Sequence, residues 1–243
     1  MLTAKQEQAL ARMQLDSVMN DFQLMRSQLT QARKELAIAQ TAAMHALGTA
    51  LAKRIPGQGL RQKRIATIAV SIARQSGCPT SECRDIGLVA PLYNLGLLAM
   101  NDESIAEADS TLSSVREQIQ RGIELAGKDT PLQRLACDVI HHHREHWDGS
   151  GRPDGLRHEQ IPFAARIVAV AETYDRMLHG RSELGKQQSR VTFAQMSGRE
   201  FDPRLVTAAL ESESRIAAVT SYLSQRGNTH SPQPEVELMS VLL

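Results

Sequence analysis

Two neighbouring stretches carry the strongest signals in this sequence: HREHWDGSGRPDGL at residues 143–156 and IPFAARIVAVAETYDRML at residues 161–178. The first predicts a tight turn, because glycine tolerates positive φ and proline restricts the backbone. The turn comprises Asp148, Gly149, Gly151, Arg152 and Pro153. The second has apolar residues on nearly every side of a helix, which predicts a buried helix. A histidine beside such a turn is also typical of a functional site.

The composition predicts an all-α protein. Aromatic residues make up 3% of the 243 residues, and sheets favour aromatic and β-branched residues. Lys and Arg total 28 against 27 for Asp and Glu, a net charge of +1, so bulk charge favours neither a nucleic acid polymer nor a membrane surface. No apolar run approaches the roughly 18 residues of a membrane span. We therefore expect a cytoplasmic protein whose three cysteines are buried apolar residues.

A long helix is expected at residues 4–54, which contain no proline and only one glycine, Gly48. Its apolar residues recur in steps of three and four, which indicates a coiled-coil seam. One seam position is occupied by Leu15, Phe22, Leu29 and Leu36, and the other by Val18, Met25, Ala32 and Ala39. This pattern favours a homodimer through the N-terminal helix, and the alternative is a helix that packs on its own domain. Pro56 and Gly57 end it.

Three parts of the chain are expected: a heptad helix at 1–56, a helical domain at 57–225 and a flexible tail at 226–243. Helices are predicted at 60–76, from Ser110 or Thr111 to Gly127, at 131–145 and at 161–178. Thr80 or Ser81 is the expected N-cap of another helix. Residues 181–200 are polar and read as a loop, and a further helix begins at Pro203, a favourable first helical residue.

Three segments in the same order resemble the HD-GYP domain, an all-helical relative of the HD-domain metal phosphohydrolases. HREHWDGSGRPDGL is similar to the HHExWDGxGYPxGL motif of that family, IPFAARIVAVAETYDRML to IPxxARIxAVADxYDAL, and REFDPRLVTAAL to HFDPxLVxAF. The resemblance covers residues 45–210. It implies an HD-domain-like helical bundle, preceded here by the long helix. In the family, two or three iron or manganese ions support hydrolysis of cyclic di-GMP.

Aligned position by position, most of the metal-ligand positions that the family resemblance implies carry other residues. The HD pair corresponds to Tyr93 and Asn94 in LYNLG, which is the YN form of the family motif. The other former ligand positions are Arg61, Gln118, His143, Arg144 and Glu172. Among these seven, His143 is identical and Glu172 is chemically equivalent to the family residue. Since a guanidinium cannot deprotonate to become a ligand, we expect neither catalytic residues nor a bound metal or other cofactor.

The run His141–His143 leaves a second alignment open. A shift by one residue would match His142 and His143 to the paired histidines of the family, but it requires an insertion before Glu145. The alignment without a gap keeps Glu145, Trp147 and Asp148 in place. Under either alignment the HD pair is absent.

Four further residues occupy positions that align with the family: Arg152, Arg166, Asp175 and Arg181. Arg166 on the buried helix needs a partner, for which Glu145 and Asp148 are the candidates. Arg152, Asp175 and Arg181 are candidate phosphate or ligand contacts, and the alternative for Asp175 and Arg181 is a pair of ordinary ion pairs.

Three functions follow from this resemblance. The first is a non-catalytic regulatory or scaffold protein of cyclic di-GMP signalling that binds other proteins, for example the GGDEF domain of a diguanylate cyclase. The second is a cyclic di-GMP phosphodiesterase with a rebuilt site that uses His143, Glu172 and His141 or His142. The third is a receptor that binds cyclic di-GMP through Arg61, Arg144, Arg152 and Arg181.

Overall fold

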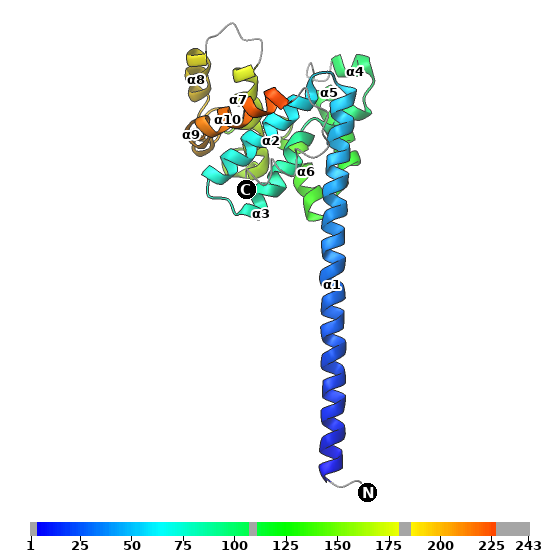
Figure 1. Ribbon diagram of the computed structural model, residues 1–243. Coiled ribbons are helices and arrows are strands. Elements are labelled where there is room, and N and C mark those ends of the chain that lie inside the picture. Colours follow the sequence, from blue (N-terminus) through cyan, green and yellow to red (C-terminus); the bar gives the residue numbers. More distant parts are fainter. Residues whose placement is uncertain (1–3, 107–110, 180–185, 227–243) are drawn as a thin grey trace. The chain divides into compact units, whose positions relative to one another are not determined.

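The computed structural model describes residues 4–106, 111–179 and 186–226 (Figure 1). Within these ranges the regular elements are helices, apart from an isolated bridge between Ser197 and Phe201. The predicted all-α fold is therefore confirmed. The elements are α1 (Ala4–Arg54), α2 (Gln58–Gln75), α3 (Thr80–Val89), η1 (Ala90–Leu92), η2 (Leu95–Ala99), α4 (Asp102–Ala106), α5 (Leu112–Ala126), α6 (Pro131–His142), η3 (His158–Gln160), α7 (Phe163–His179), α8 (Lys186–Gln195), α9 (Pro203–Glu211) and α10 (Glu213–Arg226).

The chain divides into two compact units, residues 1–43 and residues 44–243. The described part of the first unit is the N-terminal portion of α1 alone. Its large seam residues are between 54% and 63% exposed: Leu15, Val18, Phe22, Met25, Leu29 and Leu36. Other apolar residues of this helix, such as Met19 and Ile38, are exposed as well. The regular spacing of the seam, rather than exposure itself, therefore distinguishes it.

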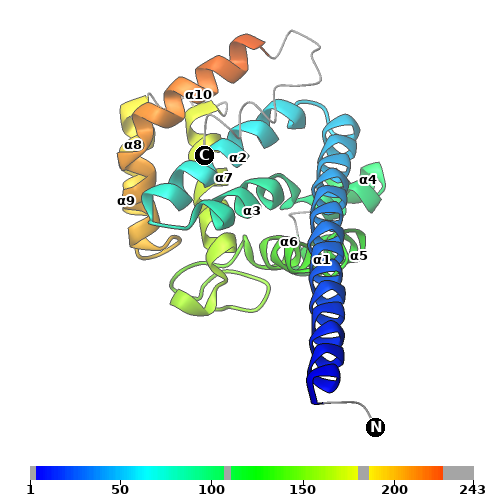
Figure 2. The same ribbon diagram turned by 60° about the horizontal axis from the view of Figure 1, so that its bottom comes forward.

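The second unit begins inside α1, where Met44 and Leu51 are buried. Its centre is the pair α2 and α7, which lie against each other in both views (Figures 1 and 2). Helix α2 also contacts α3, α9 and α10, and α7 contacts α6, α8 and α9. The fully buried side chains of the pair include Ile65, Ile68, Ile72, Ile167, Val168 and Val170. Burial of a central helix on nearly all sides explains the continuous apolar pattern of residues 161–178.

Local signals explain most helix ends. Thr111 and Thr130 accept hydrogen bonds from the third residues of α5 and α6, so both helices begin with a capping box. Helix α2 ends before Gly77, whose φ is +82°. Two expectations were wrong. The N-cap of α3 is Pro79, without a side-chain cap. Residues 186–195 form α8 instead of a loop, because Phe193 packs into the core and offsets the low helical signal of its polar neighbours.

Two glycines allow η2 and α5 to approach each other. A Cβ atom on Gly96 would lie 1.8 Å from the backbone carbonyl oxygen of Gln118, and one on Gly122 would lie 3.0 Å from the backbone nitrogen of Gly96. Neither backbone segment can yield without moving a whole element. This contact sets Asn94, just before η2, beside Gln118 on α5.

No helix in the described ranges is both long and apolar enough to cross a membrane. The tail expected at 226–243 falls outside the described residues from 227 onward.

We predict that Gly96→Ala lowers the free energy of unfolding by at least about 2 kcal/mol, because the methyl group meets backbone atoms. The matched control is Gly48→Ala within α1, where the nearest atom to the new Cβ is Leu92 Cδ2 at 3.8 Å. There, alanine should stabilise the helix by up to about 1 kcal/mol. Denaturant unfolding of the three proteins measures both changes. Equal stability of Gly96→Ala and the wild type would contradict the described contact.

Candidate functional site

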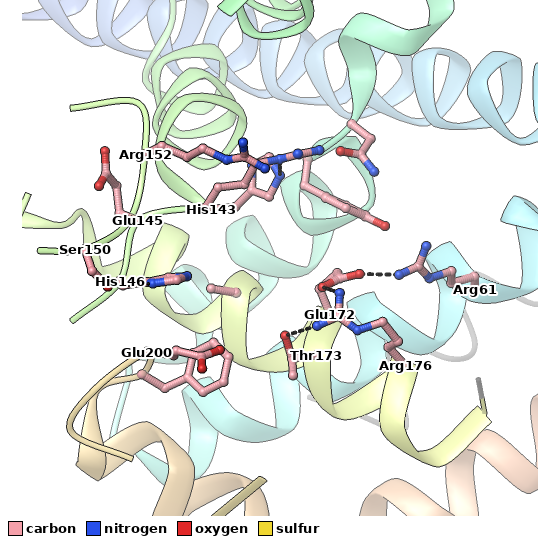
Figure 3. A pocket seen from close by; sticks show the side chains of 16 residues that line it. Arg61, His143, Glu145, His146, Ser150, Arg152, Glu172, Thr173, Arg176 and Glu200 are labelled. Carbon is pink, nitrogen blue, oxygen red and sulfur yellow. Dashed lines mark hydrogen bonds and ion pairs between the residues drawn. The ribbon is translucent and has the colours of Figure 1, made fainter. Parts of the chain in front are cut away.

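A cavity of about 580 Å³ lies between α2, the turn at Tyr93–Asn94, residues 143–152 and α7 (Figure 3). Arg61 enters it from α2, and Ala169, Glu172, Thr173 and Arg176 enter it from α7. Both polar and apolar side chains line it. The remaining lining residues are Tyr93, Asn94, His143, Arg144, Glu145, His146, Ser150, Gly151, Arg152, Glu200 and Phe201.

The former ligand positions of the sequence alignment meet at this cavity. Six of them line it directly: Arg61, Tyr93, Asn94, His143, Arg144 and Glu172. The seventh, Gln118, lies behind the wall and contacts two of the others. His143 and Arg144 line the cavity and His142 does not, which is the placement that the alignment without an insertion requires.

Hydrogen bonds join four of these side chains in a row. Gln118 Nε2 donates to Asn94 Oδ1 at 2.9 Å, and Gln118 Oε1 accepts from Arg144 Nη2 at 3.3 Å. Arg144 Nε in turn donates to His143 Nε2 at 3.2 Å. The amide of Gln118 therefore uses both ends to connect the Asn94 segment with the Arg144 segment. Gln118 is buried, so these partners replace the water that its amide would otherwise bind.

The partners of His143 fix the roles of its two ring nitrogens. Nδ1 lies 3.0 Å from the carbonyl oxygen of Val139 and 3.2 Å from that of Ile140. A carbonyl only accepts, so Nδ1 carries the hydrogen and Nε2 is the acceptor. The lone pair of Nε2 points to the Arg144 guanidinium. In this arrangement the nitrogen that could bind a metal is already engaged.

Glu172 lies between two arginines (Figure 3). Its Oε1 atom accepts a hydrogen bond from Arg61 Nη2. Its Oε2 atom lies 3.4 Å from Nη1 of Arg176, one helical turn further along α7. Both carboxylate oxygens are therefore paired with guanidinium groups. Charge-assisted pairs of this kind are among the stronger hydrogen bonds in proteins.

Asp175 is 1% exposed and does not line the cavity. It accepts hydrogen bonds from Arg64, and His179 Nδ1 lies 3.3 Å from its Oδ1 atom. Burial alone raises the pKa of the Asp175 carboxyl, but the hydrogen bonds from His179 and Arg64 bring this pKa below its ordinary value. The structure thus gives Asp175 an ion pair between α2 and α7. Arg181, the other candidate in this group, falls outside the described residues.

Tyr93 is buried, and its ring packs edge-on against His143 with the centroids 5.2 Å apart. Burial raises the pKa of its hydroxyl to about 12, so the group stays protonated at neutral pH. The hydroxyl oxygen has no hydrogen-bond partner among the described residues. A neutral phenol replaces, at this position, the imidazole that the family resemblance implies.

The turn of residues 148–153 is held by buried contacts. Glu145 is 2% exposed, and its two carboxylate oxygens accept from the backbone N–H groups of Asp154 at 2.7 Å and Leu156 at 3.2 Å. Gly151 is required because a Cβ atom there would lie 2.1 Å from the backbone nitrogen of His146. The N–H of Asp148 donates to the carbonyl of Arg199. The turn is therefore fixed to both α6 and the segment before α9.

The expected partners of Arg166 were wrong. Arg166 Nη1 lies 2.7 Å from Asp202 Oδ2, and its guanidinium stacks over Trp147. Glu145 is unable to serve because its carboxylate binds the turn. Asp202 also caps α9 by accepting from the N–H of Arg204. One buried carboxylate thus starts a helix and neutralises a buried arginine, which a local sequence pattern does not reveal.

These side chains do not fit a dinuclear metal centre. Iron and manganese prefer carboxylate and imidazole ligands, whereas five of the seven positions offer guanidinium, phenol or amide groups. The remaining two, His143 and Glu172, have their lone pairs directed to Arg144, Arg61 and Arg176. An ion could bind them only by displacing these arginines.

Sequence reasoning missed several lining residues, among them His146, Ser150, Thr173, Arg176 and Glu200. One signal was available for Arg176, which follows Glu172 by four residues and so shares its helix face. Glu200 had no such signal, since it reaches the cavity only through the backbone pairing of residues 199–200 with Trp147 and Asp148.

Comparisons with known proteins agree with this fold. The HD domain family matches residues 45–205. A cyclic di-GMP phosphodiesterase response regulator of Xanthomonas campestris pv. campestris, RpfG, is 28% identical over 93% of this chain and 61% of its own length. A cyclic di-GMP phosphodiesterase of Thermotoga maritima is 26% identical over 72% of this chain and 52% of its own length. A 3'3'-cGAMP-specific phosphodiesterase of Vibrio cholerae is 28% identical over 73% of this chain and 35% of its own length.

The chain thus spans between about a third and three fifths of the length of these relatives. Among solved structures, a cyclic GMP-AMP specific phosphodiesterase of V. cholerae (V-cGAP3) matches with a TM-score of 0.58 and 18% identity, covering 83% of this chain and 58% of the other. This likeness concerns the fold. The chain therefore belongs to the HD domain family, among relatives of the HD-GYP type.

Proposed function

We propose that this protein is a non-catalytic regulatory member of the HD-GYP group that acts in cyclic di-GMP signalling through contacts with other proteins. The observation that carries the proposal is the pairing of His143 and Glu172, the two remaining ligand-type residues, with arginines. Guanidinium groups hold the positions from which a metal centre would be built.

Energetics favour the arginines over an ion. Arg61 and Arg144 place guanidinium groups, which cannot become metal ligands, at two of the aligned ligand positions. Displacing them from Glu172 and His143 would leave partly buried charges without their present partners, which costs several kcal/mol. A second ion would then face two fixed positive charges.

The relatives connect the chain to cyclic dinucleotides. Those cited above are named phosphodiesterases of cyclic di-GMP or 3'3'-cGAMP. In this chain, the same fold is combined with ligand-type residues that are paired with arginines. We take regulation, rather than hydrolysis, as the function that this combination supports best.

Two alternatives use the same cavity. A phosphodiesterase with a residual site would bind an ion at His143 and Glu172, and its distinguishing property is turnover. A receptor would bind cyclic di-GMP through the arginines that line the cavity, Arg61, Arg144, Arg152 and Arg176. Its distinguishing property is a saturable heat of binding without turnover, with Arg181→Ala as a further comparison.

We also propose that two chains pair through α1. In a coiled coil, the seam of residues 15–39 is covered by the same seam of a second copy. The charges beside the seam favour a parallel pair: Asp21 and Glu35 lie on one flank, and Arg26 and Arg33 lie on the other. A parallel pair brings opposite flanks together, whereas an antiparallel pair would place acid against acid and base against base.

We propose a GGDEF-domain protein as the heterologous partner. Its proposed contact surface on this chain, called here the partner surface, comprises the turn of residues 148–153 and the exposed residues 157–160. Arg157, His158, Glu159 and Gln160 are exposed there. The buried carboxylate of Glu145 keeps this surface rigid, which lowers the entropy cost of binding.

The first prediction concerns turnover. Incubated with cyclic di-GMP and Mn²⁺ or Fe²⁺, the protein should release no product above the buffer rate, while the T. maritima relative serves as the positive control. Chromatography of the nucleotides measures this. Turnover by the wild type that disappears in Glu172→Gln would refute the non-catalytic proposal and favour a residual metal site.

The second prediction concerns the seam. Leu29→Glu should weaken self-association at least about 100-fold, because two charges would be buried in the seam, and this corresponds to about 2.7 kcal/mol. Gln23→Glu, on the outer face of the same helix, should leave self-association unchanged. Sedimentation equilibrium measures both. A monomeric wild type, or a dimer equally strong in Leu29→Glu, would overturn the pairing.

The third prediction concerns the partner. Tagged wild-type protein should co-purify from its native cells with a protein that contains a GGDEF domain. Arg157→Glu should no longer bind this partner, because the substitution reverses the charge of an exposed residue on the partner surface. Arg84→Glu, an exposed residue on α3, is the matched control. Capture of the same GGDEF protein by all three forms would argue against this surface.

A further inference from the structure

Three metal-ligating side chains gather outside the cavity, where α6 ends and the turn begins. His141 Nε2 lies 3.0 Å from Asp154 Oδ2, and His142 Nδ1 lies 3.8 Å from the same oxygen. The three ligand atoms all lie within 4.8 Å of one another. The two imidazole rings stack with centroids 4.3 Å apart, and only His141 is within hydrogen-bond distance of the carboxylate.

These separations fit a small metal ion. Ligand atoms that bind zinc at about 2.0–2.1 Å in a tetrahedral site lie roughly 3.3 Å from one another. The two distances to Asp154 Oδ2 bracket that value. Because an imidazole binds a metal in its ring plane, one ion can bind both rings only after they turn out of their parallel stack, and the half-exposed side chain of His141 has room for this rotation.

An unsatisfied nitrogen provides a second, independent observation. His142 Nδ1 is buried and has no hydrogen-bond partner among the described residues. A buried polar atom without a partner costs about 1–3 kcal/mol, so its presence calls for a group that satisfies it. Asp154 Oδ2 lies 3.8 Å from this nitrogen, which is too far for a hydrogen bond. A metal ion between them would satisfy both.

The carboxylate of the cluster is held in place and open to solvent. The backbone N–H of Asp154 donates to the buried carboxylate of Glu145 at 2.7 Å. This hydrogen bond fixes the position of the Asp154 backbone. The side chain of Asp154 is 45% exposed and that of His141 is 35% exposed, which gives an ion and its water a path to the cluster. Rigid support of this kind is what metal sites require.

We propose that His141, His142 and Asp154 bind one divalent transition-metal ion of the zinc type, with water completing its coordination. Two imidazoles and one carboxylate suit zinc, nickel or copper, whereas magnesium and calcium prefer oxygen ligands alone. The ion joins the end of α6 to the turn that carries Arg152 and precedes the exposed segment 157–160. It thereby stabilises the proposed partner surface and takes no part in the chemistry of the cavity.

Calorimetric titration of the full chain with ZnCl₂ tests this site. We expect one ion per chain and at least about tenfold weaker binding in both Asp154→Asn and His142→Gln, because each removes one ligand. His45→Gln, an exposed histidine on α1, is the matched control and should bind like the wild type. Thermal unfolding without zinc verifies that each variant is folded.

Glu172→Gln separates this site from the cavity. It should bind zinc like the wild type, since Glu172 lies in the cavity and outside the cluster. Absence of saturable binding, or unchanged affinity in Asp154→Asn and His142→Gln, would overturn the proposed site. Binding lost in Glu172→Gln but kept in Asp154→Asn would place the ion in the cavity. That result would overturn this site and also contradict the proposed function.

Discussion

The pairing of α2 with α7 is the constraint on which the rest of the second unit depends. Apolar contact extends along most of the pair, and ion pairs join its remaining part, where Arg61 and Arg64 of α2 meet Glu172 and Asp175 of α7. The two arginines are three residues apart on α2 and the two acids are three residues apart on α7, so each set shares one face of its helix. Of these ion pairs, the one between Arg61 and Glu172 also lines the cavity. One ion pair therefore both joins α2 to α7 and sets the charge at the cavity wall.

Under the proposed non-catalytic function, this coupling lets the fold form without a metal centre. In a metal enzyme, ions neutralise carboxylates that would otherwise repel one another. Here arginines pair with Glu172 and Asp175 from within the chain, and hydrogen bonds run in a row from Asn94 through Gln118 and Arg144 to His143. These hydrogen bonds satisfy the buried amide of Gln118 and hold the segments around the cavity together. A preserved shape with changed chemistry is what a regulatory protein requires.

Much of this could be read from the sequence where the signal is local. Thr111 was among the expected starts of α5, and its cap depends only on neighbours on that element. The aligned positions also converged on one cavity, because the family motifs mark elements that pack together. Helix α8 was missed because its core residue Phe193 stands among polar ones. Arg166 was assigned the wrong partner because Asp202 lies 36 residues away in sequence. The requirement for glycine at position 96 depends on the backbone of α5, which no local pattern contains.

The central claim is that arginines, rather than metal ions, occupy the ligand lone pairs of the cavity. Anomalous X-ray scattering at the manganese edge, from crystals soaked in Mn²⁺, tests it most directly. We expect no anomalous peak between His143 and Glu172, with the Arg144 guanidinium within hydrogen-bond distance of His143 Nε2. A peak bonded to His143 Nε2 and the Glu172 carboxylate, with Arg61 and Arg144 swung away, would contradict it.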